Sequence, residues 1–318
     1  MTEGGDRRPR LLITGASGLL GANMVLTAIG RCRVTAHAYP AALRAMGFDS
    51  LASDLTLPGA VERLMDDVRP DWVVHCAAQA DVDVCERDPG MAIRLNRDMA
   101  ANVAREAAAR GARLIHISTD AVFDGEAGAY READSTGPVN AYGRSKLQAE
   151  QAVLQAHPQA LIVRTNFFTW PAPGRSGLAA WFLGRLEAGQ ECPGFTDARF
   201  NPLLASLLAA ILLDLVAGKS AGVLHVAGGS CISKHEFGVR LAETFGFDPR
   251  LVRAVSSDAG GLTATRGKNL CLNTAKAEQA LGRRMPNLKE SLDLFRLEKE
   301  NGFSEGLMAV RQELPGGL

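Results

Sequence analysis

The stretch RLLITGASGLLG, residues 10–21, decides the fold. A short apolar run ends at Thr14, glycines follow at Gly15, Gly18 and Gly21, and an apolar segment with helical composition continues from there. The glycines permit a tight turn and a close approach of the backbone to a pyrophosphate, and the start of the helix offers unpaired N–H groups and a favourable dipole. The stretch therefore predicts a strand–turn–helix unit that binds a dinucleotide, although a plain glycine-rich turn would share the pattern.

The first half of the chain repeats this alternation of strand and helix. The runs that predict strands are short and rich in Val, Ile and Leu: Arg10–Thr14, Arg33–Ala38, Trp72–Cys76, Ala112–Ser118 and Ala160–Arg164. The segments that predict helices are Leu19–Ile29, Pro58–Val68, Pro89–Arg110 and Asn140–Gln155. We expect Pro58 and Pro89 in first turns and Gly111 just after a helix end. Buried strands separated by helices predict an α/β fold, a Rossmann-type doubly wound parallel sheet.

The pattern changes after Thr165. Residues 170–177 are rich in Pro and Gly and predict a loop. An apolar run at Val223–Ala227 predicts one more strand, which can rejoin the sheet. The remaining segments that predict helices are Trp181–Ala188, Leu203–Val216, Lys234–Phe245, Thr274–Leu281 and Leu288–Glu298. The tail at residues 315–318 is expected to fray.

The composition excludes several classes of protein. Lys+Arg and Asp+Glu are both 35, so no overall field draws the chain to nucleic acid or to an anionic membrane. Met1–Arg10 lacks the apolar core of a signal peptide, and Leu203–Val216 is too short to span a bilayer. The six cysteines have no C-x-x-C spacing and the six histidines no ligand spacing. We therefore expect a cytoplasmic protein with reduced thiols and no metal.

Tyr142 and Lys146 lie four residues apart and share one face of a predicted helix. A lysine ammonium there can favour the phenolate, and moving a tyrosine pKa from about 10 to near 7 takes roughly 4 kcal/mol. Such a tyrosine exchanges a proton with a carbonyl or an alcohol at neutral pH. Ser118 and Thr119 end a predicted strand at the edge where such sheets bind ligands, so either hydroxyl can bond a substrate oxygen. A solvated Tyr–Lys pair and a capping hydroxyl are the alternatives.

The order of these motifs resembles the extended short-chain dehydrogenase/reductase superfamily, and within it the dTDP-4-dehydrorhamnose reductase family. Besides the glycine turn, the resemblance rests on Ala77-Ala78, Val82-Asp83 with Glu86, Leu95-Asn96, STDAVFDG at residues 118–125, Tyr130-Arg131-Glu132 and PVNAYGRSKL at residues 138–147. It is dense from Leu11 to Arg164 and thin afterwards. It implies an NAD(P)-binding Rossmann domain over residues 8–168, to which 197–228 return. Residues 169–196 and 229–310 would form a smaller C-terminal substrate-binding region.

The resemblance implies an NAD(P)H-dependent reductase of a nucleotide-diphospho 4-keto-6-deoxy sugar. Hydride would pass to C4 and Tyr142 would donate the proton. Lys146 would bind the nicotinamide ribose and lower the pKa of Tyr142, Thr119 would be the catalytic hydroxyl with Ser118 as its neighbour, and Asn96 would order the site through backbone or water. The implied cofactor contacts are Gly15, Ala16, Ser17, Gly18, Leu19, Leu20, Gly21, His37, Asp54, Leu55, Cys76, Ala77, Ala78, Gln79, Asn96, Ser118, Tyr142, Lys146 and Thr165. The implied substrate contacts are Val82, Asp83, Ala121, Phe123 and Arg266.

Departures from the pattern bear on cofactor and substrate. The second predicted strand ends in AHAY, residues 36–39, without the acid expected about 20 residues beyond the glycines, which favours NADP(H) over NAD(H). The nearest cations that could meet a 2′-phosphate are Arg33 and Arg44. Ala121 stands where the family has a tyrosine, so we expect a different pocket. Arg266 and Lys268 are candidates to hold a diphosphate, with solvated surface charges as the alternative.

Two other functions remain open. A nucleotide-sugar epimerase of the same superfamily would use a retained cofactor, whereas Asp120-Ala121 after Thr119 counts against a dehydratase, which has Asp-Glu there. A non-catalytic, NADP-binding regulatory subunit is an alternative of another class. The beta subunit of methionine adenosyltransferase shares the Val-Phe-Asp-Gly stretch and the Y-x-x-x-K spacing. We favour the enzyme because nothing in the order of the active-site motifs is broken. We expect a nucleotide sugar as small-molecule partner and leave a homodimer open.

Overall fold

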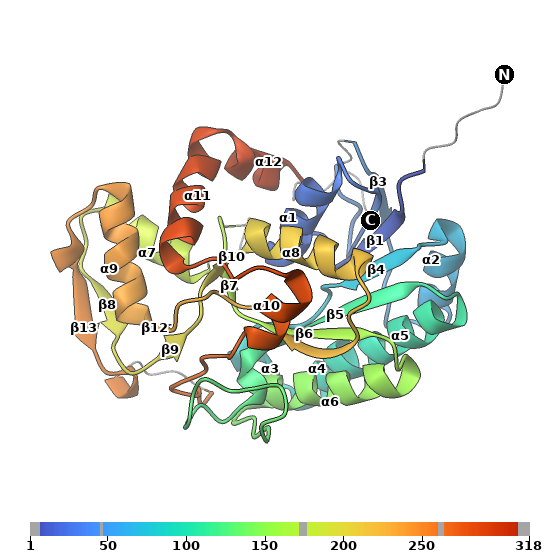
Figure 1. The fold of residues 1–318 in the computed structure, drawn as a ribbon, viewed down its shortest axis with the longest axis horizontal. Coiled ribbons are helices and arrows are strands. Elements are labelled where there is room, and N and C mark those ends of the chain that lie inside the picture. Colours follow the sequence, from blue (N-terminus) through green and yellow to red (C-terminus); the bar gives the residue numbers. More distant parts are fainter. Residues whose placement is uncertain (1–6, 45–46, 172–176, 260–263, 311–318) are drawn as a thin grey trace.

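A seven-stranded parallel sheet forms the centre of the molecule (Figure 1). The structure is a computed structural model that describes residues 7–44, 47–171, 177–259 and 264–310. The strand order is β11-β6-β5-β4-β1-β2-β3. The strands are β1 (Arg10–Thr14), β2 (Arg33–Ala38), β3 (Asp49–Ala52), β4 (Trp72–His75), β5 (Arg113–Thr119), β6 (Leu161–Thr165) and β11 (Gly222–His225). This order confirms the predicted doubly wound sheet, and β11 rejoins it beside β6 as expected.

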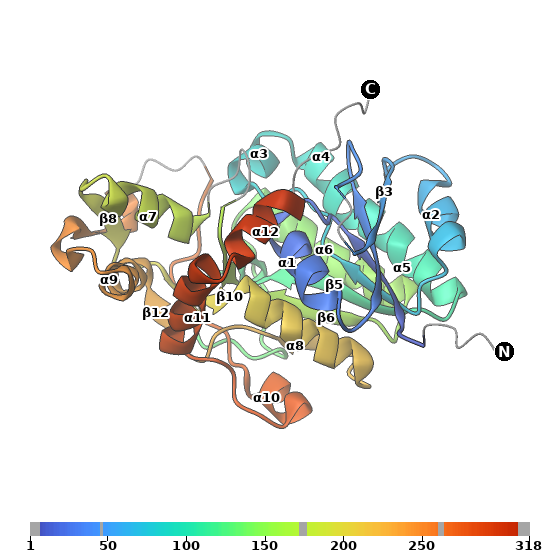
Figure 2. The same cartoon turned by 90° about the horizontal axis from the view of Figure 1, so that it is seen from above.

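Helices cover both faces of the sheet because successive side chains of each buried strand point to opposite sides. On β1, Leu11 and Ile13 pack into one hydrophobic cluster and Leu12 into another. The first cluster includes residues of α1 (Leu19–Ala28), α8 (Ala205–Ala217) and α12 (Phe303–Val310). The second includes residues of α2 (Ala60–Val68), α5 (Met99–Ala109) and α6 (Ala141–Ala156). Figure 2 shows these helix layers from above.

A smaller lobe lies beside the sheet body, on the left of Figures 1 and 2. It holds α7 (Leu178–Glu187), β8 (Cys192–Phe195), α9 (Lys234–Phe245), β13 (Val252–Val255) and α11 (Leu288–Glu300). Phe168 contacts Phe237 and Phe295 of this lobe with ring centroids 5.1 and 5.3 Å apart, so one hydrophobic cluster runs from the sheet into the lobe. The predicted division into domains stays a prediction.

Several further elements are short. They are β7 (Phe167–Phe168) paired with β10 (Leu203–Leu204), β9 (Arg199–Phe200) paired with β12 (Ile232–Ser233), α10 (Ala275–Leu281), and the single turns Pro249–Leu251 and Ser257–Ala259. The predicted loop at 170–177 lies largely outside the described residues, and so does the tail at 315–318. None of the helices within the described ranges is long and apolar enough to cross a membrane. In those same ranges, no three His, Cys, Asp or Glu side chains gather as metal ligands would.

Three local differences from the predicted elements have physical reasons. Pro58 was expected in the first turn of α2, but this was wrong, because Gly59 in a left-handed conformation precedes the helix and Pro58 lies outside it. The predicted helix from Pro89 is divided into α4 (Pro89–Ala92), a π-helical turn (Ile93–Asp98) and α5. Gly111 follows α5 with a φ of +68°, as expected of a glycine just after a helix end.

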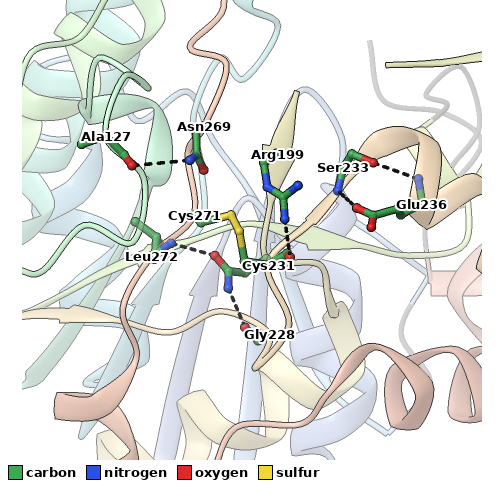
Figure 3. Close-up of a disulfide and its surroundings, with 10 residues drawn as sticks. Ala127, Arg199, Gly228, Cys231, Ser233, Glu236, Asn269, Cys271 and Leu272 are labelled. Atoms are coloured by element: carbon green, nitrogen blue, oxygen red, sulfur yellow. Dashed lines mark hydrogen bonds between the residues drawn. A yellow bond between two sulfur atoms is a disulfide. The ribbon is translucent and has the colours of Figure 1, made fainter. Parts of the chain in front are cut away.

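The expectation that all six thiols are reduced was also wrong. Cys231 and Cys271 form a disulfide that closes a separation of 40 residues, whereas Cys32, Cys76, Cys85 and Cys192 are free (Figure 3). Asn201 links the two segments that carry the cysteines, because its side chain donates to the Gly228 carbonyl at 3.0 Å and accepts a hydrogen bond from the Leu272 backbone N–H at 2.7 Å. Gly228 and Leu272 lie beside the disulfide in Figure 3. Sequence spacing alone carries no sign of such a contact.

The segment that carries Cys271 also packs against the Rossmann half. A Cβ added to Gly125 would lie 2.5 Å from the Cα of Gly267, and the backbone N–H of Asn269 donates to the Gly125 carbonyl at 2.8 Å. Since real Cβ atoms do not approach backbone so closely, the two glycines allow the segments to touch.

Candidate active site

A groove runs along the carboxyl edge of the sheet and consists of two adjoining cavities. They have volumes of about 330 and 260 Å³ and share Gly15, Gly18, Cys76 and Ala78 in their walls. Ligands of open α/β sheets bind at this edge. The shared wall makes the cavities two ends of one elongated site.

The glycine turn between β1 and α1 forms the middle of this groove. Gly15 has a φ of +68°, and a Cβ on it would lie 2.6 Å from the backbone of Ala77. A Cβ on Gly21 would lie 2.2 Å from the Gly15 carbonyl oxygen. Only glycine fits at these positions, and the first turn of α1 opens beside them. The turn therefore fits a dinucleotide pyrophosphate, which needs close backbone approach and a helix N-terminus.

Most of the predicted cofactor residues line the groove. The first cavity contains Gly15, Ser17, Gly18, His37, Asp54, Leu55, Cys76, Ala77, Ala78 and Gln79. The second contains Gly15, Gly18, Leu19, Leu20, Gly21, Cys76, Ala78, Ser118, Thr119, Tyr142, Lys146 and Thr165. Ala16 lines neither cavity and is fully buried in the core. The prediction missed the neighbouring residues Tyr39, Ser53, Thr56, Ala80, Leu95, Met99, Ile117, Asn166 and Phe167.

Asn96 supports the groove from behind, through the backbone. Its amide oxygen accepts the Gln79 N–H at 2.8 Å, and its amide nitrogen donates to the Gln79 carbonyl at 3.0 Å and to the Ser145 hydroxyl at 2.9 Å. Asn96 is 1% exposed and lies in the π-helical turn, a distortion often found at functional sites. The side chain thus ties the loop after β4 to α6, and its role in ordering the site stays a prediction.

The start of α6 fixes the position of Tyr142. The Asn140 side chain caps the helix by accepting the Gly143 N–H at 2.8 Å. A Cβ on Gly143 would lie 2.2 Å from the Ala121 carbonyl oxygen, so the first turn sits directly against the loop after β5. This contact brings Tyr142 and Thr119 into the same cavity wall.

The electrostatics of Tyr142 differ from the expectation. Burial raises the pKa of its phenol above the ordinary value, although a hydrogen bond with Thr119 favours the phenolate. Lys146 does not supply the expected opposing effect, because its Nζ donates to the Ile117 carbonyl at 2.7 Å and lies 3.2 Å from His116 Nε2. Burial also lowers the pKa of Lys146 to about 8. In this structure, Tyr142 is therefore a neutral phenol.

The two predicted hydroxyls have different surroundings. The Ser118 hydroxyl donates to Glu150 Oε1 at 2.5 Å, and Glu150 forms a buried ion pair with Arg164 at 2.8 Å. Thr119 points to the other side of the strand, where its Oγ1 accepts the Ala121 N–H and donates to Asp120. The Ser118 hydroxyl is thus engaged by Glu150, although Ser118 also lines the inner cavity, and its catalytic role stays a prediction.

The predicted substrate residues are only partly brought together. Arg266 donates to Asp83 Oδ2 at 3.0 Å, and the Ala264 N–H donates to Asp83 Oδ1 at 2.9 Å; these bonds lower the pKa of Asp83. Val82 is half-buried next to Asp83 in α3 (Val82–Arg87). Ala121 is half-buried in the loop after β5, two residues beyond Thr119. Lys268 pairs instead with Asp197 and Asp258, as the surface alternative predicted.

Phe123 was wrongly expected to contact the substrate. Its ring is fully buried, stacks on Tyr130 with centroids 4.2 Å apart, and lies 5.0 Å below the Arg164 guanidinium. It belongs to the hydrophobic core beneath the loop after β5. A burial of this kind cannot be inferred from the motif alone.

Two charged residues near the site were missed. Asp120 is 3% exposed, and its Oδ2 accepts a hydrogen bond from Asn166 Nδ2 at 2.7 Å. Burial raises the pKa of Asp120 to about 6. Lys234, the first residue of α9, lies 5.7 Å from the Phe195 ring centroid, and the Asp120 carboxylate opposes the lowering of its pKa by burial. Asp120 follows Thr119 directly in the sequence, and this was the available signal. Lys234 stands alone in an ordinary helical pattern.

The fold and the groove define the class, an NAD(P)-dependent oxidoreductase of the extended short-chain dehydrogenase/reductase type. Comparison with known proteins narrows it. The chain belongs to the family described as the RmlD substrate binding domain, whose model matches residues 9–299.

Three known proteins illustrate the relationship. Over 258 residues the chain is 38% identical to a dTDP-4-dehydrorhamnose reductase of Mycobacterium tuberculosis, covering 79% of this chain and 80% of that protein. Over 314 residues it is 31% identical to methionine adenosyltransferase 2 subunit beta of Pongo abelii, covering 91% and 89%. The structure of dTDP-4-dehydrorhamnose reductase from Bacillus anthracis in complex with NADP superposes with a TM-score of 0.81 at 26% identity, covering 92% and 99%.

Proposed function

We propose that the protein reduces the 4-keto group of a nucleotide-diphospho 4-keto-6-deoxy sugar with NAD(P)H. The observation that carries the proposal is the position of Tyr142 in one cavity wall with Thr119 and Lys146, at the inner end of the dinucleotide groove. The similarity to a dTDP-4-dehydrorhamnose reductase supports this substrate class.

The residues of the inner cavity have distinct roles in the proposal. A bound dihydronicotinamide would supply the hydride. Tyr142 holds a proton at Oη, because burial raises the pKa of the phenol and keeps it neutral, and it donates that proton to the alkoxide oxygen. Thr119 bonds the same oxygen from β5. Lys146, 3% exposed, places a cation in the wall and holds the cofactor ribose.

The cofactor would occupy the groove with its adenosine end in the first cavity. We propose NADP(H) as the preferred form. β2 ends at Ala38 without a carboxylate, and Asp54 Oδ1 accepts both the backbone N–H and the hydroxyl of Thr56, so it is turned toward its own loop. Arg33 begins β2 at the opposite edge of the sheet, which leaves Arg44 as the nearer cation. Tenfold tighter binding of NAD(H) than of NADP(H) would refute this preference.

The test is oxidation of NADPH and NADH with a panel of dTDP-, UDP-, GDP- and CDP-linked 4-keto-6-deoxy sugars. Tyr142→Phe should lower kcat by a factor of about 10² to 10⁴, since it removes a general acid. Thr119→Val should lose activity comparably, whereas Ser118→Ala should keep kcat and lose stability. Full activity in Tyr142→Phe would refute the mechanism.

A regulatory subunit is the second candidate function, favoured by the 31% identity to methionine adenosyltransferase 2 subunit beta. It predicts measurable binding of NADP(H) without turnover of any sugar. An epimerase would instead interconvert two nucleotide sugars with no net consumption of reduced cofactor. Product analysis and calorimetric titration of the cofactor distinguish the three outcomes. The cytoplasm is the compartment we propose, and light scattering would decide whether the chain forms a homodimer.

A further inference from the structure

Two buried histidine rings lie under the inner cavity, and the proton transfer proposed above uses neither. His75 on β4 and His116 on β5 are partners in the register of the sheet, and each is 1% exposed. Their rings stack with centroids 5.4 Å apart. They differ in their bonds, because His75 Nδ1 lies 2.7 Å from the Thr14 hydroxyl, whereas His116 Nε2 lies 3.2 Å from Lys146 Nζ.

The contact with Lys146 fixes the state of the His116 ring. Burial and the nearby ammonium lower the pKa of His116 well below its ordinary value, so the ring is neutral. A lysine ammonium has only donors, and therefore His116 Nε2 must accept and Nδ1 must carry the ring proton. Within the described part of the chain, Nδ1 has no hydrogen-bond partner. The only described polar contact of this ring is thus the one with Lys146.

His116 and the Ile117 carbonyl together occupy two of the three N–H groups of Lys146. A free lysine side chain samples many rotamers, so two fixed acceptors hold it at a defined place. Among the residues that the structure describes, the third N–H has no acceptor, so it can bond a ligand in the cavity that Lys146 lines. We propose that His116 is a positioning residue that holds the Lys146 ammonium protonated and directed at the cofactor ribose, an inference that rests on the proposed function.

Two ionisable groups besides the histidines act on the charge of Lys146. Glu150 on the same helix and the Cys76 thiol after β4 favour its charged form, while burial disfavours it. Glu150 is already paired with Arg164, and the Lys146 charge lowers the pKa of His75 as well as that of His116. A neutral acceptor at His116 therefore stabilises the ammonium without adding a competing charge.

The test is a pH titration of Lys146 by its ¹³Cε resonance in lysine-labelled protein without cofactor, assigned by its loss in Lys146→Arg. In His116→Leu, which removes the acceptor, the midpoint should fall by about one pH unit, a tenfold change in the ionisation constant. His116→Gln, whose amide oxygen reaches the Nε2 position, should restore it. His75→Leu is the matched control, because this equally buried ring does not contact Lys146. In this variant the Lys146 midpoint should stay at the native value.

An unchanged midpoint in His116→Leu, or an equal shift in His75→Leu, would overturn the proposal. If His116→Leu does not fold, His116→Asn takes its place, because the Asn side chain is polar but too short to reach Lys146 Nζ. His116→Asn should then shift the Lys146 midpoint, and His116→Gln should leave it unchanged. If the protein also reduces a sugar, the basic limb of kcat/KM should move with the titration. If no sugar of the panel is reduced, the proposed function is refuted, while the Lys146 titration still decides the role of His116.

Discussion

Asp120 and Asp124 lie four residues apart around the loop after β5, and their carboxyl groups should respond to pH in opposite directions. Burial raises the pKa of Asp120 from 3.8 to about 6, despite hydrogen bonds from Asn166 and Thr119. Hydrogen bonds from the Tyr130 hydroxyl and from backbone N–H groups lower the pKa of Asp124. The pair allows one experiment to separate the effect of burial from that of hydrogen bonding.

The sign for Asp120 follows from linkage. Its folded pKa is higher than its unfolded pKa, so the native state binds more protons, and stability present below pH 3.8 is lost as the pH rises through 6. The rise from 3.8 to about 6 corresponds to about 3 kcal/mol above pH 7. Asp120→Asn is neutral at every pH and lacks this loss. It should match the native protein near pH 4 and exceed its free energy of unfolding by up to about 3 kcal/mol at pH 8.

Urea unfolding, followed by tryptophan fluorescence between pH 4 and pH 8, measures the difference. Asp124→Asn is the control with the opposite sign. The folded pKa of Asp124 is lowered, so its carboxylate stabilises the native protein above the unfolded pKa, and the loss of free energy of unfolding in the variant relative to the native protein should be larger at pH 8 than at pH 4. If Asp120→Asn changes the free energy of unfolding equally at both pH values, burial does not dominate at this carboxyl. Loss of stability at pH 8 would refute the reasoning entirely.

Three further substitutions test the packing around the site. Gly143→Ala places a Cβ 2.2 Å from a backbone carbonyl oxygen, so it should displace the start of α6 and lower kcat by about 10²-fold, measured in the sugar assay. Glu150→Gln leaves Arg164 buried without its counter-charge and should cost about 3 to 5 kcal/mol in urea unfolding. Replacement of Cys231 and Cys271 by serine opens a separation of 40 residues and should cost about 2 to 4 kcal/mol. Thiol titration of the denatured, unreduced protein should find four reactive cysteines.

Each substitution has its own control. Gly184→Ala, in α7, meets nothing within 4 Å and should leave kcat unchanged, so an equal loss there would contradict the steric argument for α6. Glu243→Gln breaks an exposed pair with Arg240 and should not change stability measurably. Six reactive thiols in the unreduced protein would contradict the disulfide.

The sheet could be predicted from the sequence because its strands are buried on both faces and form continuous apolar runs. β3 (Asp49–Ala52) was missed because this short edge strand is largely exposed and lacks such a run. α3 (Val82–Arg87) was missed because six residues carry little periodic signal, and the cap from Asp81 becomes apparent only in the structure. Local patterns thus predicted the central elements and failed at the short peripheral ones.

The groove was largely predictable because its walls consist of the glycine turn and the residues at the carboxyl ends of the strands, which can be located once the strands are predicted. The orientation of individual side chains was not. Ser118 and Thr119 are neighbours on one strand, and only the folded chain shows that the first hydroxyl bonds Glu150 and the second bonds Asp120. His116 escaped notice because its meaning depends on Lys146, a residue on another element that approaches it only in the folded chain.

The contact between Gly125 and Gly267 has a consequence for redesign of substrate preference. Two segments distant in sequence touch through bare backbone, so any side chain at Gly125 would separate the loop after β5 from the segment that carries Arg266. A mutant library that randomises these glycines would sample mainly misassembled proteins. Ala121 and Val82 have half-exposed side chains near the site and tolerate variation better. New substrate preferences can therefore evolve through a few side chains such as Ala121 and Val82, while the contact between Gly125 and Gly267 has to be kept.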